Sequence, residues 1–304
     1  MKKILWMVSL LIAMMGFCTA LAQEKPNEVI FTKGQIAEVG SDTVRVVGQG
    51  AHREIVLDVT ASTHIVSAED GRTLDFAALQ KGEKVVAYYG PQVRKSMPPQ
   101  ASAIALVVGT PTSGGIGMYM QVATVQKKSD GNIRALSTNG DMLITIRKEI
   151  FPQHNNVREG SELLAWYNMM TMSMPGQATA IKAVLLPAQI KVHLGNGVIF
   201  ANGKELPLDE GDNILVSGEK IMLPLRVIME NLGYDLLWDG ERQQVRVLSG
   251  AHIAAAFRIG STSYQKGQEL IELADAPVVI NGKTLMPVEF FSDVLSMKVQ
   301  IINS

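Results

Sequence analysis

The sequence predicts a multidomain, mainly β protein. We expect two tandem small β-barrel-like domains, followed by an α+β domain in which two short helices lie on a sheet. Three observations lead to this fold class. Short strands with alternating polar and apolar residues, separated by glycine-rich turns, fill the chain up to about residue 185. Most of that strand pattern occurs twice. Near the C-terminus, proline-initiated amphipathic helices follow short strands.

Residues 1–22 have the features of a secretory signal peptide. Lys2 and Lys3 come before a stretch without charge, and Ala20-Leu21-Ala22 forms a cleavage site of small residues. A membrane anchor, the alternative, needs about 18 or more apolar residues and different flanks. We therefore expect cleavage before Gln23 and an extracytoplasmic protein, which is periplasmic, bound to the cell envelope or secreted.

Charge and cysteine content exclude several classes of function. Two of the 28 basic residues lie in the signal, so the mature chain carries 26 basic against 29 acidic side chains. This balance provides no electrostatic footprint for nucleic acid. Cys18, the only cysteine, also lies in the signal, which excludes disulfides and thiol chemistry from the mature chain. No second hydrophobic span follows, so we expect no stable membrane span after cleavage.

The first two predicted domains are copies of one another. Residues 23–109 form copy 1, 110–117 a linker rich in Gly, Ser and Pro, and 118–188 copy 2. The closest match lies between Ala87-Tyr88-Tyr89 and Ala165-Trp166-Tyr167, which are 78 residues apart. Short strands separated by glycine favour a small closed or half-closed barrel, and a sandwich is the alternative. Because these aromatic residues occur in both copies, we expect them in the core rather than on a ligand-binding face.

A strand–proline–helix–glycine–strand unit organises the third domain, residues 189–304. It runs from Gly218 to Gly240: Pro224 is expected at the first helical position, Gly233 as the left-handed cap, and a β-hairpin after the helix. A weaker copy occurs at Asn281–Gln300, with a predicted helix over 288–295. The unit predicts an architecture and contains no catalytic constellation.

Motifs in this part of the chain resemble a known family. They are Asn202-Gly203-Lys204, Leu223-Pro224-Leu225-Arg226, Glu230-Asn231-Leu232-Gly233, Trp238-Asp239 and the block Ala276–Pro287. Together they resemble the copper amine oxidase N-terminal (stalk) domain-like family over roughly residues 190–304. The resemblance implies an appended, non-catalytic module of secreted or envelope-associated bacterial proteins. It implies no copper enzyme, because the sequence lacks the Asn-Tyr-acid segment and the His-x-His pair of the oxidase's separate catalytic domain.

The most unusual chemistry lies in a methionine cluster. Met170, Met172 and Met174 alternate, so in a strand their three thioethers would face one side. Soft sulfur ligands suit Cu(I), which makes these residues the candidate metal ligands. The alternative is that they fill irregular core or an apolar hairpin tip.

Other candidate residues have simpler interpretations. Arg226 and Glu230 stand four apart on the first predicted helix, where a surface ion pair is favoured over a ligand clamp. Trp238 is expected as a half-buried strand aromatic rather than a sugar platform. The five histidines are scattered without zinc spacing. The sequence indicates no catalytic residue and no cofactor.

These observations predict an exported, non-catalytic binding or scaffolding protein of the bacterial cell envelope. We expect it not to be an enzyme, and its partner to be a protein or polysaccharide of the envelope. Extracytoplasmic binding of Cu(I) through the methionine cluster is the alternative. An unrecognised hydrolase, with a site assembled from distant loops, is the second alternative.

Overall fold

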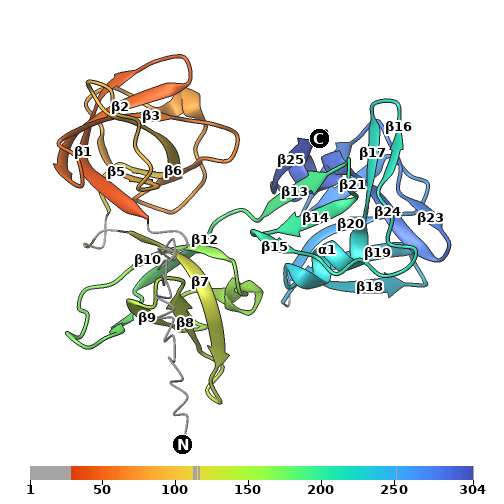
Figure 1. Ribbon diagram of the computed structural model, residues 1–304. Helices are drawn as coiled ribbons and strands as arrows, with labels where there is room; N and C mark the ends of the chain where they lie inside the picture. Colours follow the sequence, from red (N-terminus) through yellow and green to blue (C-terminus); the bar gives the residue numbers. More distant parts are fainter. Residues whose placement is uncertain (1–28, 112–114, 116, 251, 304) are drawn as a thin grey trace, which may run out of the picture.

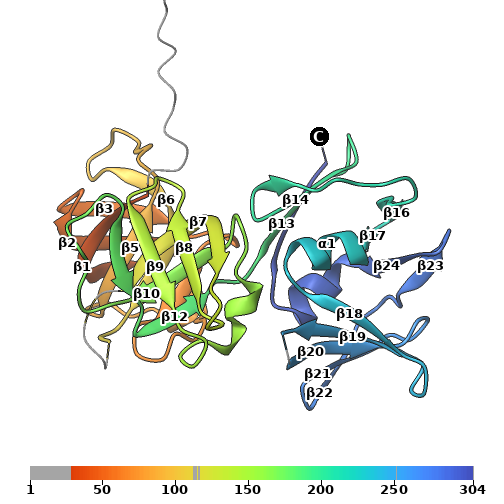
Figure 2. The ribbon, with the colours of Figure 1, turned by 90° about the horizontal axis from the view of Figure 1, so that it is seen from below.

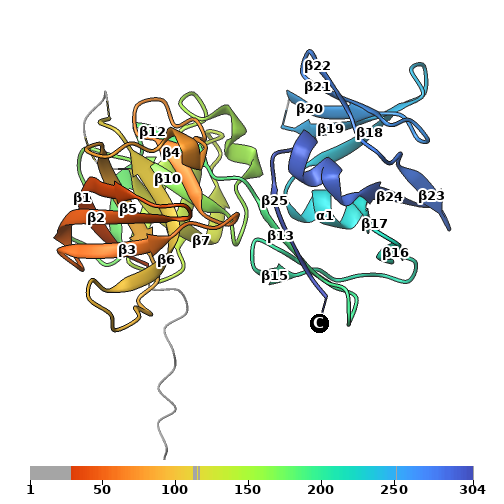
Figure 3. The same ribbon diagram turned by 90° about the horizontal axis from the view of Figure 1, so that it is seen from above.

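The computed structural model describes residues 29–111, 115, 117–250 and 252–303 (Figure 1). The predicted signal peptide and part of the predicted linker therefore lie outside the described residues. The fold is mainly β, with barrel-like sheets and two short helices in its C-terminal part, which confirms the fold class at this level. The three views show two curled sheets lying against each other, with the C-terminal unit beside them (Figures 1, 2 and 3).

The first barrel is built from residues 30–108. Its elements are β1 (Ile30–Val39), β2 (Thr43–Gly50), β3 (Glu54–Asp58), β4 (His64–Ser67), η1 (Phe76–Ala78), β5 (Lys84–Tyr89) and β6 (Gln100–Val108). The strand order is β3-β2-β1-β5-β6-β4, and a parallel pairing between β3 and β6 closes the sheet. A three-strand meander, whose third strand pairs in parallel with the last, is the connectivity of the Greek-key barrels called OB-folds.

The second barrel, residues 118–185, has the corresponding strand order. Its elements are β7 (Met118–Lys127), β8 (Ile133–Ser137), β9 (Met142–Ile146), η2 (Pro152–Asn156), β10 (Glu162–Trp166), β11 (Gly176–Thr179) and β12 (Lys182–Leu185). The sheet order is β11-β9-β8-β7-β10-β12, with β11 parallel to β9. The two outermost strands are separated in the chain only by Ala180 and Ile181, so this sheet curls like the first with its last strand broken in two.

The two barrels meet through an apolar interface. Along β5, Val85, Ala87 and Tyr89 pack inside the first barrel, whereas Val86 and Tyr88 point outward to a separate buried cluster. On the second barrel that cluster contains Tyr119, Leu164, Trp166 and Leu186. The expectation that the repeated aromatic residues are buried is confirmed for Tyr88, Tyr89 and Trp166. Because β5 is apolar on both faces, the barrels are held together by a core of their own.

The C-terminal unit contains three sheets. Its first elements are β13 (Gln189–His193), β14 (Val198–Ala201), β15 (Lys204–Glu205), β16 (Leu215–Ser217), β17 (Lys220–Pro224), α1 (Leu225–Asn231), β18 (Asp235–Asp239) and β19 (Gln244–Ser249). There follow β20 (His252–Phe257), β21 (Ser263–Lys266), β22 (Glu269–Glu272), β23 (Val278–Ile280), β24 (Lys283–Pro287), η3 (Phe290–Val294) and β25 (Lys298–Ile302). Strand β25 returns to pair in parallel with β13.

The two strand–proline–helix copies pack against each other around a local two-fold relation. Strands β17 and β24 are antiparallel, and Leu223 pairs with Met286, the residue 63 positions later that occupies the same place in the second copy. The lysine of each copy reaches an aspartate that lies a few residues before the other copy. Lys220 Nζ lies 2.7 Å from Asp275 Oδ1, and Lys283 Nζ lies 3.1 Å from Asp212 Oδ1.

The helix boundaries differ slightly from the prediction. Pro224 ends β17 and caps α1 instead of opening the helix, while Gly233 adopts the predicted left-handed conformation with φ of 84°. The second helix begins at residue 288, as predicted, and ends at residue 294, one residue earlier than predicted. Its last five residues form the π-helical turn η3. Ser296, equivalent to Gly233, holds a φ of 55°.

Candidate functional site

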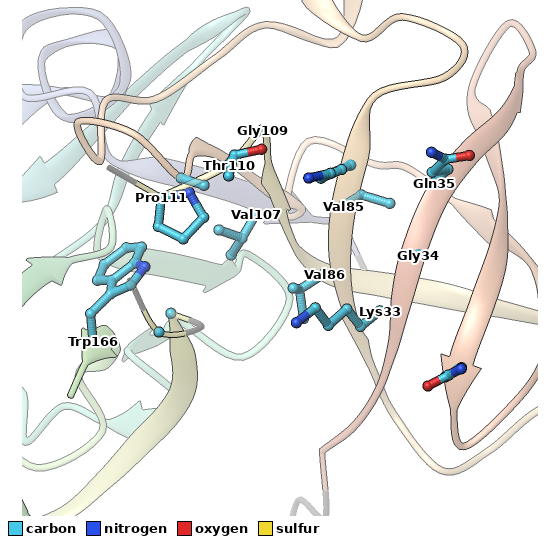
Figure 4. A pocket seen from close by; sticks show the side chains of 15 residues that line it. Lys33, Gly34, Gln35, Val85, Val86, Val107, Gly109, Thr110, Pro111 and Trp166 are labelled. Atoms are coloured by element: carbon cyan, nitrogen blue, oxygen red, sulfur yellow. The ribbon is translucent and has the colours of Figure 1, made fainter. Parts of the chain in front are cut away.

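A cavity of about 570 Å³ opens between the two barrels (Figure 4). Its floor is the outer face of the first barrel, and one wall is Trp166 of β10 in the second barrel. The chain between them contributes Gly109, Thr110 and Pro111. This volume falls within the range of small-molecule sites in proteins, which also lie preferentially between domains.

The floor of the cavity follows from strand register. Gln49 pairs with Lys33, Lys33 with Val86, and Val86 with Val107, so these four residues form one row across β2, β1, β5 and β6. Lys84 of β5 also lines the cavity, two positions from Val86 on the same face. The cavity therefore has a cationic side and an apolar side.

Trp166 joins the cavity to the barrel interface. The ring is fully buried, and its indole Nε1 has no hydrogen-bond partner among the described residues. Figure 4 shows the indole nitrogen on the side of the ring that faces Val107 and Pro111. Lys182 Nζ stands over the ring, 4.4 Å from its centre. Residue 117 must be glycine, since a Cβ there would lie 2.5 Å from the indole ring.

A buried polar cluster joins all three parts of the molecule. Glu162 of β10 receives hydrogen bonds from His64 Nε2 at 2.7 Å, Tyr119 Oη at 2.8 Å and Gln189 Nε2 at 3.1 Å. Gln189 pairs with Lys298 across β13 and β25. The Nζ of Lys298 is buried without a hydrogen-bond partner among the described residues.

The protonation states of this cluster follow from burial and hydrogen bonding. Burial lowers the pKa of His64 despite its bond to Glu162, and burial lowers the pKa of Lys298 to about 8. Burial would raise the pKa of Glu162, but the hydrogen bond from His64, followed by those from Tyr119 and Gln189, makes the net shift downward. A neutral His64 that donates from Nε2 to a charged Glu162 agrees with these directions, and it leaves Nδ1 as a buried acceptor.

Sequence reasoning missed this cluster. His64, Tyr119, Glu162, Gln189 and Lys298 come from three separate parts of the chain, and no spacing connects them. The sequence offered one weak indication of this cluster, because Lys298 is the one charged residue in the strand Lys298–Ile302. The cluster has the form of an interdomain lock, because each hydrogen bond of Glu162 to His64 or Gln189 joins two different units.

The methionine cluster does not lie in a β-strand. Residues 167–175 connect β10 to β11 as a loop, in which Met170 makes only an isolated bridge with Ala178. Met172 is fully exposed, and Met169 and Met174 are more than four fifths exposed, whereas the Met170 sulfur would lie 2.8 Å from a Cβ at residue 176. The chain turns at Ser173 and Pro175, so the three thioethers do not line one face of a strand.

The remaining candidates lie at the surface. Arg226 Nη1 and Glu230 Oε1 form the expected ion pair at 2.7 Å, with both side chains more than half exposed. Trp238 lies in β18 and is 53% exposed, which agrees with a half-buried strand aromatic. Within the described residues, no three His, Cys, Asp or Glu side chains gather as a metal site. The described residues likewise form no helix long and apolar enough to span a membrane.

Comparison with known proteins gives one curated relative and one family model. A curated relative from Brevibacillus choshinensis, named as a protease inhibitor, is 29% identical over 118 residues, which is 36% of this chain and 36% of the relative. The chain therefore spans about a third of that relative's length. Residues 200–304 match the model of the copper amine oxidase N-terminal domain family. Over this segment, the resemblance carried by the Asn-Gly-Lys, Leu-Pro-Leu-Arg and Trp-Asp motifs is confirmed.

Proposed function

We propose that this chain is an exported, non-catalytic binding or scaffolding protein of the bacterial cell envelope. Its C-terminal unit matches a domain that the resemblance describes as an appended module. The observation that carries the proposal is the cavity between the barrels, which is lined by Lys33 and Lys84 and by part of the chain that joins the barrels. Two barrels fixed by a shared apolar core hold that cavity in one shape, which lowers the entropic cost of binding.

Retention on envelope material tests this function. The mature chain, beginning at Gln23, is passed over washed envelope fractions and over purified peptidoglycan, and the retained fraction is measured at low and high salt. We expect specific retention on at least one of these materials. Passage through all of them without retention would contradict the proposal.

The exposed methionines support a second candidate function, the binding of Cu(I). Thioethers on a solvent-exposed loop are available as soft ligands, whereas methionine is usually a core residue. Titration with Cu(I) under reducing conditions should show binding that is lost when Met170, Met172 and Met174 are all changed to Leu. Met97→Leu is the matched control, because Met97 is a fully exposed methionine on the corresponding loop of the first barrel. Equal binding by the triple variant would exclude this site.

The relative's name adds proteases to the partners that should be tested. Inhibition of a panel of secreted proteases by the mature chain would redirect the search from envelope material to an enzyme target. Incubation of the chain with each protease, followed by residual activity and by gel analysis of the chain itself, separates an inhibitor from a substrate.

A further inference from the structure

The duplicated barrels place different chemistry at equivalent positions. In the first barrel, β1 and β5 pair so that Gln35 stands opposite Lys84 and Lys33 opposite Val86. In the second barrel, β7 and β10 pair so that Gln121 stands opposite Glu162 and Tyr119 opposite Leu164. Lys84 therefore corresponds to Glu162, and Lys33 corresponds to Tyr119.

On the second barrel this position is a docking point. Glu162 is bound by Gln189 of the C-terminal unit, with Lys298 of the same unit beside it, and by His64 of the first barrel. An acceptor on the barrel thus meets donors from the elements that pack over it. The cluster is buried because the C-terminal unit covers it.

On the first barrel the equivalent position is open, and its charge is reversed. Lys33 and Lys84 line the cavity between the barrels. None of the ion pairs among the described residues includes either lysine. Lys84 stands here where the second barrel presents the acceptor Glu162, and Lys33 stands where Tyr119 donates to it. Both positions of the first barrel therefore offer donors, and the complementary occupant is an anion.

The rest of the cavity fits the other end of such a ligand. Val86, Val107 and Trp166 form an apolar wall beside the lysines. The buried indole Nε1 of Trp166 is a donor without a partner, and an unmade hydrogen bond of a buried group is unfavourable.

We infer that the cavity between the barrels binds an organic anion, with the charged head at Lys33 and Lys84 and an apolar body against Val86, Val107 and Trp166. This inference rests on the proposed binding function and names the chemical class of ligand for that site. A carboxylate and a phosphate monoester share the chemistry that the two lysines recognise. Neutral ligands of the same shape leave the lysines without a counter-charge and bind less tightly.

Tryptophan fluorescence can report on this cavity directly. The mature chain holds two tryptophans, so Trp238→Phe leaves Trp166 as the single reporter. This variant is titrated with octanoate, 4-phenylbutyrate and octyl phosphate, and in parallel with octanamide and 4-phenylbutyramide. We expect saturable changes in Trp166 emission with at least one anion, and binding at least tenfold weaker for the matched amide. The carboxylate and phosphate arms show which head group is preferred.

Charge-removal variants tie the signal to the lysines. In the same background, Lys33→Gln and Lys84→Gln should each weaken anion binding about tenfold, because each removes one charge-assisted contact. Lys81→Gln is the matched control, since Lys81 is an exposed lysine in the turn before β5 that does not line the cavity. Circular dichroism and thermal unfolding of each variant confirm that it is folded.

The outcomes separate the inference from the proposed function. Equal affinity for anion and amide, or unchanged affinity in Lys33→Gln and Lys84→Gln, overturns the anion class while leaving a ligand cavity in place. No response of Trp166 to any of the three anions overturns the inference itself. Retention on envelope material is measured independently, so its presence or absence decides the proposed function alone.

Discussion

At the scale of single residues, backbone conformation distinguishes the two proline–helix copies. Gly233 ends the first helix in the left-handed region, and Ser296 holds the same conformation in the second copy. A residue with a Cβ is disfavoured there by roughly 1 kcal/mol. In the sequence, Ser296 stands where the first copy has its helix-ending Gly233. In the structure, this serine must adopt a backbone conformation that favours glycine.

Ser296→Gly should therefore stabilise the protein. We expect the free energy of unfolding to rise by about 0.5–1 kcal/mol, because glycine relieves the left-handed strain. Urea denaturation measures the change, and Ser296→Ala is the control that removes the hydroxyl bonded by Lys266 while keeping the Cβ. A loss of stability in the glycine variant would show that this hydrogen bond outweighs the strain.

The buried Lys298 should make the stability of the protein depend on pH. Burial lowers its pKa to about 8, so between about pH 8 and its ordinary value near 10.5 the unfolded chain binds more protons than the folded chain. The contribution of Lys298 to the free energy of unfolding therefore rises with pH across this window. This contribution is lowest below pH 8.

Lys298→Met should raise the free energy of unfolding at pH 7 by on the order of 1 kcal/mol, since it removes a charge that the fold disfavours. The gain should shrink as pH rises from 8 to 10. Thermal or urea unfolding across this range tests the prediction, with Lys191→Met of β13 as the exposed-lysine control. A less stable variant at pH 7 would mean that attraction to Glu162 compensates for burial.

At the scale of elements, local sequence patterns predicted where the strands lie better than they predicted which strands pair. Alternation and glycine turns predicted most strands, and the repeated Ala-aromatic-Tyr segments predicted β5 and β10 as equivalents. The break between β11 and β12 was not predicted, because no glycine or proline separates Thr179 from Lys182 in the sequence. The crossed contacts between the proline–helix copies also depend on the antiparallel pairing of β17 and β24, which spacing does not reveal.

The crossed lysine–aspartate contacts should differ in strength despite their equivalent positions. Asp212 is buried, whereas Asp275 is about one third exposed. We expect Asp212→Asn to lower the free energy of unfolding by about 2 kcal/mol and Asp275→Asn by about 0.5 kcal/mol, because the Asp212 carboxylate is screened from water and also accepts from the backbone N–H of Asp209, whereas water reaches Asp275. Each variant serves as the control for the other in urea denaturation. An equal or larger loss for Asp275→Asn would contradict this ranking.

At the scale of the whole molecule, both the cavity and the buried polar cluster form only where separate parts of the chain pack together. The cavity combines Lys33 and Lys84 of one barrel with Trp166 of the other, and the polar lock combines His64, Glu162 and Gln189 from three units. Sequence motifs could identify the C-terminal unit and the duplication. They could not identify residues that meet only because two barrels pack through their outer faces.

The central claim is that this protein binds an envelope component through the cavity between its barrels. The most direct test compares retention on envelope material for Gln49→Trp, which places a bulky ring at the cavity rim, and Val47→Trp, two residues away on the same strand and outside the cavity. Both positions are exposed, so both variants should fold. We predict that Gln49→Trp loses retention and Val47→Trp keeps it. Equal retention of both variants would contradict the claim.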